Sequence, residues 1–184
     1  MTARAGIALG AALRLWWLAC GLVLLAGPVR ADELPEYRLK AAFVYNFLVF
    51  TEWPGATGGT GGSLNLCILG KDPFGAEIDG LQGKQAAGRS IALHRRTGTD
   101  PLKGCQAVFV AASAIDSLLR VLDSLQGLPV LLLADSPGAL RKGVALNMGV
   151  ALGKVNFEAN LGAARSAGLT LSSKLLRLAT EVLP

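Results

Sequence analysis

Apolar residues follow two periods along this chain, one typical of strands and one typical of helices. Four stretches are either apolar throughout or alternate apolar with polar residues, and each predicts a strand: Ser63–Gly70, Arg89–Arg96, Cys105–Ala112 and Leu128–Asp135. Apolar residues three and four positions apart predict a helix at Ala114–Gln126. Shorter helices or turns are predicted after Asp72-Pro73 and at Pro137–Lys142. Strands and helices are therefore expected to alternate along the chain.

The end of the chain predicts a pair of strands and a closing helix. The stretch GVALNMGVALGKVNFEAN at residues 143–160 predicts two strands with a turn near Gly149–Gly153. The stretch LTLSSKLLRLATEVL at residues 169–183 predicts an amphipathic helix, whose apolar face consists of Leu171, Leu175, Leu178 and Val182. Together these elements predict an α/β fold, a single-domain sandwich with a mainly parallel central sheet flanked by helices.

Two apolar runs near the N-terminus raise the question of a membrane. The first, Leu15–Ala26, follows Arg4 and Arg14, and as a helix its 12 residues rise about 18 Å, short of the roughly 30 Å hydrocarbon core. Gly27-Pro28 and then small residues follow it, as at a signal-peptide cleavage site. We therefore predict an export signal at residues 1–31 and one domain at residues 32–184. An uncleaved anchor and a lipid attachment at Cys20 are the alternatives.

The second apolar run, Ala41–Phe50, is about half as long as a bilayer requires. Apolar residues occur on both sides of the predicted helix, which indicates a helix covered on most sides in the protein core. The one polar residue of this run, Asn46, is expected to be buried and to hydrogen-bond a neighbouring backbone. Trp53-Pro54 is expected to end the helix.

Length and charge limit the classes of function. The chain has 184 residues, room for one ordinary domain, and 52% of them are hydrophobic, which argues against disorder. The formal charge is +5, but residues 1–31 carry three arginines and no acid, and the remainder carries 15 basic and 13 acidic residues. This balance gives no indication of a nucleic-acid partner.

Two of the three cysteines lie in the predicted domain, Cys67 and Cys105. An even number in an exported protein predicts a disulfide, and each cysteine belongs to a predicted buried strand. Neighbouring strands would bring the two Cα atoms within disulfide range. We predict a structural disulfide, with a redox switch as the alternative. A metal site is disfavoured, because two cysteines and one distant histidine make a poor ligand set.

The residues give little indication of catalysis. His94 is the single histidine and lies in a predicted edge strand, where a solvated side chain is expected. No Gly-x-Ser-x-Gly motif supports a serine nucleophile. The glycine-rich stretch Gly55–Gly62 lacks the Gly-Lys-Ser/Thr ending of a phosphate-binding loop and is interpreted as a connector. We therefore predict a protein that is not an enzyme, with no cofactor and no metal.

Four segments resemble the YfiR-like family of exported bacterial proteins. They are LKAAFVYNFLVFTEWP at Leu39–Pro54, LCILGKDPFG at Leu66–Gly75, GCQAVFVAAS at Gly104–Ser113 and VNFEANLGAARSAGLTLSSKLLRLATEV at Val155–Val182. The resemblance covers nearly all of the predicted domain in the family's order, and the cysteine pair matches one that the family often carries. The first and last segments hold the most specific combinations of residues.

The resemblance implies a periplasmic regulatory protein with an α/β sandwich fold. Its best-understood form restrains an inner-membrane diguanylate cyclase by binding that enzyme's periplasmic sensor domain, which lowers cyclic di-GMP and disfavours biofilm. Other members serve different sensors, so the alternative is a periplasmic ligand-sensing partner of a histidine kinase or an uptake system. The resemblance also implies a homodimer and a small-molecule pocket.

The chain departs from the family in three places. Val49 stands where many members have lysine, a second cysteine pair near residues 138–145 is absent, and Val130–Asp135 replaces a strand that more often ends in Ser-Asp. The first change makes the first helix more apolar. Exposed apolar residues of that helix are candidates for the partner contact, and we assign Val44, Leu48 and Val49 this role as a hypothesis. The alternative is that these three side chains pack in the domain's own core or in a dimer interface.

Basic residues near the end of the chain are candidates for binding an anionic ligand. The hypothesis concerns Arg165, Lys174 and Arg177. The alternative is that these side chains form the solvated face of the closing helix, the plainer interpretation of charges on an amphipathic element.

Overall fold

The computed structural model describes residues 34–55, 62–98 and 100–184. The predicted export signal and Cys20 lie outside these ranges, as does most of the glycine-rich connector. None of the helices in the described ranges combines the length and apolar character needed to cross a bilayer. The second apolar run instead forms α2 (Leu34–Val49), which packs one side in the core and leaves the other side exposed, so it is not covered on most sides as expected.

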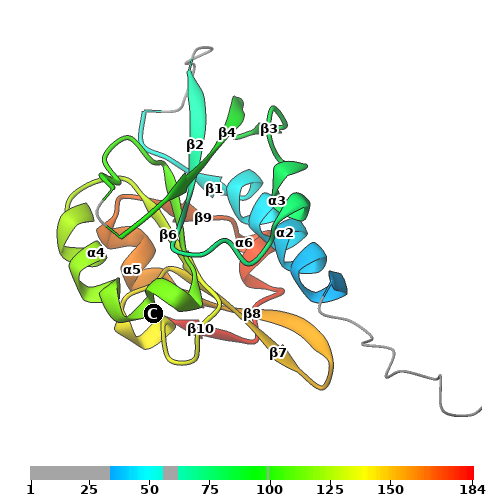
Figure 1. The fold of residues 1–184 in the computed structure, drawn as a ribbon. Helices are drawn as coiled ribbons and strands as arrows, with labels where there is room; N and C mark the ends of the chain where they lie inside the picture. Colours follow the sequence, from blue (N-terminus) through cyan, green and yellow to red (C-terminus); the bar gives the residue numbers. More distant parts are fainter. Residues whose placement is uncertain (1–33, 56–61, 99) are drawn as a thin grey trace, which may run out of the picture. The chain divides into compact units, whose positions relative to one another are not determined.

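A mixed sheet of eight strands forms the centre of the domain (Figure 1). Its strands in chain order are β2 (Ser63–Leu69), β3 (Gln85–Ala86), β4 (Arg89–Arg96), β5 (Ala107–Val110), β6 (Leu131–Ala134), β7 (Leu146–Ala151), β8 (Lys154–Asn160) and β10 (Glu181–Leu183). Their order across the sheet is β10-β8-β7-β6-β5-β2-β4-β3. The central pairs, from β7 through β6, β5 and β2 to β4, are parallel, whereas β7–β8 and β3–β4 are antiparallel. The α/β class is confirmed, with a sheet more mixed than expected.

The helices are short apart from α2. They are α3 (Ala76–Asp79), η2 (Ala112–Ser117), α4 (Leu118–Leu125), η3 (Leu140–Lys142), α5 (Leu161–Ser166) and α6 (Ser173–Leu176). A separate two-stranded sheet pairs β1 (Thr51–Glu52) with β9 (Thr170–Leu171). This pair ties the end of α2 to the segment before α6, far away in sequence.

The sheet separates two hydrophobic cores. Side chains alternate along each strand, so in β5 Phe109 packs with the core that includes α2, whereas Val108 and Val110 pack with the core that includes α4. Figure 1 shows α2 and α4 on opposite sides of the sheet. The central strands are buried on both faces, as their apolar sequences predict.

The predicted strand pair near the end of the chain is confirmed as the β7–β8 hairpin, with a tight turn at Leu152 and Gly153. Both turn residues have positive φ, 51° and 70°, as tight hairpin turns require. Glycine adopts this conformation freely, but leucine does so at a cost. Leu152 is also fully exposed, so packing does not offset that cost.

The predicted closing helix is wrong. Residues 169–183 form β9, the four-residue helix α6 and the strand β10. The Ser172 side chain caps α6 by accepting from the Lys174 backbone, and Glu181–Leu183 pairs in parallel with β8. Tertiary strand pairing overrides the helical period, because short segments take the structure that their neighbours stabilise. Leu178 and Val182, which were expected on a buried face, are exposed.

Candidate functional site

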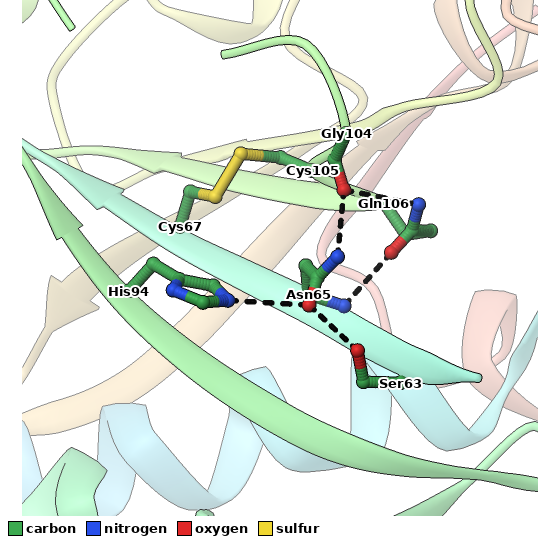
Figure 2. Close-up of a disulfide and its surroundings, with 7 residues drawn as sticks. All are labelled: Ser63, Asn65, Cys67, His94, Gly104, Cys105 and Gln106. Carbon is green, nitrogen blue, oxygen red and sulfur yellow. Dashed lines mark hydrogen bonds between the residues drawn. A yellow bond between two sulfur atoms is a disulfide. The ribbon is translucent and has the colours of Figure 1, made fainter. Parts of the chain in front are cut away.

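The predicted disulfide is present in the structure and joins β2 to the segment that precedes β5 (Figure 2). Cys67 and Cys105 have their Cα atoms 6.0 Å apart, and both side chains are buried. Asn65 fixes the same segment, because its side-chain amide donates to the Gly104 carbonyl at 2.8 Å and its backbone N–H donates to Gln106 Oε1 at 2.8 Å. The disulfide therefore lies beside a segment that Asn65 also holds by hydrogen bonds.

His94 lies against Asn65 in the same region (Figure 2). Its Nε2 is 3.2 Å from Asn65 Oδ1, which also accepts the Ser63 hydroxyl at 2.9 Å. The solvated side chain expected from the sequence is thus half-buried and hydrogen-bonded, since β4 packs beside β2 with Cys67 paired to His94. Its hydrogen-bond partner is thus an amide and not a carboxylate.

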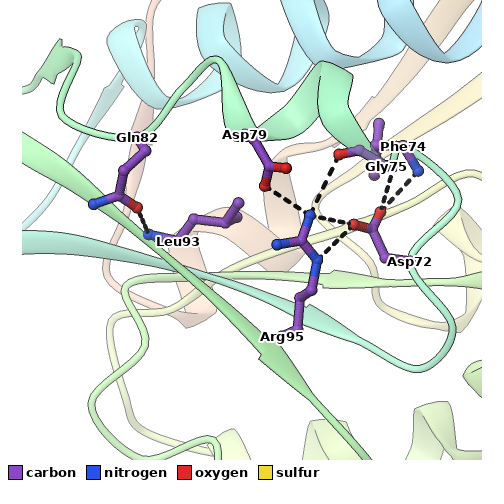
Figure 3. Close-up of polar contacts among 7 residues, drawn as sticks. All are labelled: Asp72, Phe74, Gly75, Asp79, Gln82, Leu93 and Arg95. Carbon is purple, nitrogen blue, oxygen red and sulfur yellow. Dashed lines mark hydrogen bonds and ion pairs between the residues drawn. The ribbon is translucent and has the colours of Figure 1, made fainter.

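A second polar group, centred on Arg95, holds α3 against the sheet (Figure 3). The guanidinium donates to Asp72 at 2.8 Å and to Asp79 at 2.7 Å. Hydrogen bonds to Asp79 and Asp72 raise the pKa of Arg95 above its ordinary value. The Gln82 side chain adds a link by accepting the backbone N–H of Leu93 at 2.8 Å. The charged groups are paired with one another, so we assign these contacts a structural role.

In sheets of this kind, ligands commonly bind at the carboxyl ends of parallel strands, where the strand order reverses. The reversal here lies between β2 and β5, because β2 pairs with β4 on one side and with β5 on the other. At Gly70, directly after β2, the chain is tightly packed. A Cβ at Gly70 would meet Ser113 Oγ at 2.8 Å, and the Ser113 hydroxyl accepts the Lys71 backbone N–H at 2.8 Å.

The open polar site lies farther along the same edge of the sheet, at Asp135, which directly follows β6. The Tyr37 hydroxyl donates to Asp135 Oδ2 at 3.0 Å, and Lys40 Nζ lies 2.9 Å from the same oxygen. Lys40 also pairs with Glu36 at 2.6 Å, one turn earlier on α2. The side chains of Lys40 and Asp135 are only 5% and 2% exposed, so this is a buried ion pair.

The buried pair shifts the ionisation of its neighbours. Burial lowers the pKa of Lys40, but hydrogen bonds to Asp135 and Glu36 outweigh that effect, and the pKa is raised overall. Burial and the charge of Asp135 raise the pKa of the Tyr37 hydroxyl. Lys40 therefore stays charged and Tyr37 stays neutral at physiological pH.

A cavity of about 510 Å³ opens beside this group. Its lining joins α2 to the β7–β8 hairpin and consists of Glu36, Lys40, Asp135, Pro137, Gly138, Asn147, Met148, Gly149, Val150 and Glu158. Asn147 accepts the Ser136 backbone N–H at 3.2 Å, and its amide nitrogen lies 3.4 Å from Glu158 Oε2. A second, apolar cavity of about 300 Å³ lies between α4 and α5.

The structure corrects the predicted partner contact on the first helix. Val44 and Leu48 have no exposed surface and pack in the core, because they lie on the face of α2 that covers the sheet. Val49 is 38% exposed and remains available. Asn46, which was expected to be buried, is exposed on the outer face of α2. The apolar residues on both sides of the helix gave no indication that one side would face solvent.

The predicted anion-binding residues do not form a group around either cavity. Arg165 lies on α5, whereas Lys174 and Arg177 lie on and just after α6, and all three side chains are exposed. None of them lines the Asp135 cavity or the apolar cavity. In the described part of the chain, no group of three His, Cys, Asp or Glu side chains is arranged to hold a metal ion.

The sequence reasoning missed the group around Asp135. Two signals were present: Glu36 and Lys40 stand four residues apart at the start of an apolar helix, and Asp135 ends an apolar strand. A carboxylate at the carboxyl end of a parallel strand is a common place for a ligand contact. The pairing itself was not visible, because 95 residues separate Lys40 from Asp135.

These features define a small α/β domain with one disulfide and a polar cavity at the carboxyl edge of its sheet. A family model described as YfiR/HmsC-like matches residues 37–180, and the chain belongs to this family. Members of the family are periplasmic, and they are regulatory rather than catalytic.

Solved structures share the fold at low sequence identity. An ABC domain in complex with L-Trp from Streptococcus pneumonia is similar at 10% identity and a TM-score of 0.53, covering 80% of this chain and 60% of that one. A conserved domain protein from Vibrio cholerae is similar at 12% identity and a TM-score of 0.51, covering 79% and 60%. The chain thus spans about 60% of their length. No curated protein matches it.

Proposed function

We propose that this protein is a periplasmic regulator that restrains an inner-membrane diguanylate cyclase and so lowers cyclic di-GMP and biofilm formation. The observation that carries the proposal is the match to the YfiR/HmsC-like family over residues 37–180. The regulator acts by occupancy, without chemistry of its own. It binds the cyclase's periplasmic sensor domain more tightly in the inactive arrangement, and this difference in affinity shifts the enzyme's equilibrium.

The outer face of α2 is the surface that we assign to the sensor domain. Leu39, Ala42, Asn46 and Val49 follow one another at intervals of three and four residues, so they share one side of the helix. All four are exposed, with Leu39 at 47% and Val49 at 38%. This face runs about 15 Å along the helix and carries apolar groups at both ends. Such a stripe suits a hydrophobic groove on a partner.

The test compares cyclic di-GMP in the native cell with the gene present, deleted and restored. Deletion should raise cyclic di-GMP, and the wild-type gene should return it to the starting level. Restoration with Leu39→Asp/Val49→Asp should fail, because two charges would be buried against the partner. The control is Leu119→Asp, a charge placed at a 65% exposed leucine on α4, on the opposite face of the sheet.

For this comparison to hold, both variants must accumulate in the periplasm, and their urea midpoints of unfolding must equal that of the wild type. An unchanged cyclic di-GMP level on deletion, with expression of the gene confirmed, would refute restraint of a cyclase. Full restoration by the α2 double variant would refute the assigned surface alone. Loss of a homodimer in that variant, seen by sedimentation with sensor binding intact, would assign the face to self-association.

A second candidate is a ligand-sensing partner of a histidine kinase or an uptake system. The polar cavity at Asp135 favours it, as does the similarity in fold to a domain solved with L-Trp. In that case deletion would leave cyclic di-GMP unchanged and alter the transcription controlled by the kinase, or the rate of uptake. The two outcomes separate the candidates in one set of strains.

A further inference from the structure

Strand β7 is paired along its whole length on one side only. β8 pairs with every residue of β7, whereas β6 pairs only with Leu146 and Asn147. The chain after β6 does not continue the pairing, because the Ser136 backbone N–H donates to the Asn147 side chain at 3.2 Å and Pro137 has no N–H. Residues 148–151 therefore form an open strand edge, on the part of the β7–β8 hairpin that reaches beyond β6 (Figure 1).

The free backbone groups on this edge belong to Met148 and Val150. In an antiparallel pair, residues that hydrogen-bond the partner strand alternate with residues that direct both backbone groups away from it. The C=O of Ala145 accepts the Asn160 N–H of β8 at 2.8 Å, so the alternation turns Val150 away from β8. Outside the strand ladders, no backbone hydrogen bond of the described residues involves Val150. Its N–H and C=O, and the C=O of Met148, are thus open to a partner.

The open edge lacks the features that protect strand edges from other chains. Such edges are usually blocked by charged side chains, proline or a bulge. Residues 148–152 include no charged residue and no proline, and the register with β8 runs through 148–151 without a bulge. Val150 and Leu152 are exposed, and Leu152 keeps a positive φ that asparagine or glycine adopts more easily. An apolar, unprotected edge suits the addition of a strand by an extended peptide.

The 510 Å³ cavity lies along this edge. Its lining includes Met148 and Val150 of β7 and, across from them, Pro137. Met148 packs in the core on the α2 side of the sheet, whereas the alternation of side chains puts the pair Asn147 and Glu158 on the other side. A space lined from both sides of the sheet lies in the plane of the strands. It occupies the position that β6 would take if it continued.

The charges along the edge favour a basic segment. On the α2 side, Glu36 shares the Lys40 ammonium with Asp135. On the other side, Glu158 has the neutral amide of Asn147 beside it at 3.4 Å. The ionisable groups that line the cavity are therefore three carboxylates and one ammonium. This excess of negative charge attracts a segment with basic side chains and repels an acidic one.

We propose that an extended, basic segment of a partner protein adds a strand to the open edge of β7. Its backbone pairs with Met148 and Val150, and its side chains face the two sides of the sheet alternately. Apolar side chains pack beside Val150 on the α2 side. Basic side chains on the other side reach toward Glu158 across Gly149, which has no side chain to block them. This edge is separate from the outer face of α2 and does not depend on the restraint of a cyclase, so its test can fail without affecting the proposed function.

The experiment follows the binding of a labelled peptide to the purified protein by fluorescence anisotropy. The probe is the sequence Val-Lys-Val-Lys-Val, which alternates apolar and basic side chains, and the charge control is Val-Glu-Val-Glu-Val. The basic peptide should bind one molecule per chain, and the acidic peptide should not bind. Val150→Pro removes the N–H that faces the open edge, a position where strands tolerate proline, so peptide affinity should fall about tenfold.

The matched control is Val155→Pro. Val155 is the cross-strand neighbour of Val150 on β8, so the same substitution removes an N–H from the opposite edge of the same hairpin. This variant should bind the basic peptide as the wild type does. A second control leaves the protein unchanged and places an N-methyl group on each residue of the basic peptide. That peptide keeps its side chains but loses its backbone donors, and it should not bind.

Four results would overturn the proposal. Absence of binding by the basic peptide up to about 1 mM would remove the site. Equal peptide affinity in the two proline variants, or binding of the methylated peptide, would show that no strand is added to β7. Binding of the acidic peptide as tightly as the basic one would exclude a basic partner. A wild-type dimer that Val150→Pro dissociates, seen by sedimentation, would assign the edge to a second copy of this chain.

Discussion

Reduction of the Cys67–Cys105 disulfide is the perturbation whose effect follows most directly from the structure. The two cysteines are 38 residues apart in sequence, and the bond closes this loop in the unfolded chain. The chain-entropy model assigns such a loop about 4 kcal/mol of stabilisation, through restriction of the unfolded state. A domain of this size has a total stability of about 5–15 kcal/mol, so the reduced protein is expected to remain folded with a stability of about 1–11 kcal/mol.

The assay is equilibrium unfolding in urea, with the chain refolded in either the presence or the absence of reductant. Both sulfurs are buried, so reduction has to be carried out on the unfolded chain. With an m value of ~2 kcal/mol/M, the loss of about 4 kcal/mol lowers the urea midpoint by about 2 M. The control is Cys67→Ala/Cys105→Ala, whose midpoint should be no higher than that of the reduced wild type and should not respond to reductant.

A reduced wild type that unfolds within about 0.5 M urea of the oxidised form, at an unchanged m value, would refute this reasoning. It would mean that the hydrogen bonds around Asn65 hold the segment near β5 without the covalent link. A response of the double alanine variant to reductant would show an effect unrelated to this disulfide.

Two further predictions concern local features. Tyr37→Phe removes the hydroxyl that donates to Asp135. The folded-state pKa of Tyr37 is raised above its ordinary value near 10. The contribution of the hydroxyl to stability is therefore present below about pH 10 and is lost as the pH rises through the folded-state pKa. The difference in urea midpoint between wild type and variant should therefore narrow as the pH rises above about 10, and a constant difference would contradict this. Leu152→Asn should raise stability by about 1 kcal/mol, because Leu152 has a φ of 51° and no packing to lose. A urea midpoint at or below that of the wild type would contradict the assigned strain.

The central strands could be predicted from the sequence because their signal is local. β4 has the predicted bounds, and the β7–β8 hairpin lies where alternation and the glycine turn placed it. The two-residue strands β1, β3 and β9 carry no such signal, since pairing with distant residues alone makes them strands. The same holds for β10, whose residues were compatible with a helix.

The faces of α2 show why the candidate site was only partly predictable. Leu48 and Val49 are adjacent and almost equally apolar, yet one is buried and the other is exposed. The apolar sequence gave no reason to choose between the two sides, because both contain aliphatic residues. The position of the sheet determines which side of the helix is buried, and that position cannot be predicted from the helix sequence.

The division of the core by the sheet has a consequence for how this domain can change over evolution. The helix α2 packs on one face and the disulfide lies on the other, in separate sets of buried side chains. Substitutions that share no contacts contribute to stability additively. Natural variation in the helix that we assign to the sensor therefore need not be matched by variation around Cys67 and Cys105. The signalling partner can therefore change in evolution while the core that contains the Cys67–Cys105 disulfide stays the same.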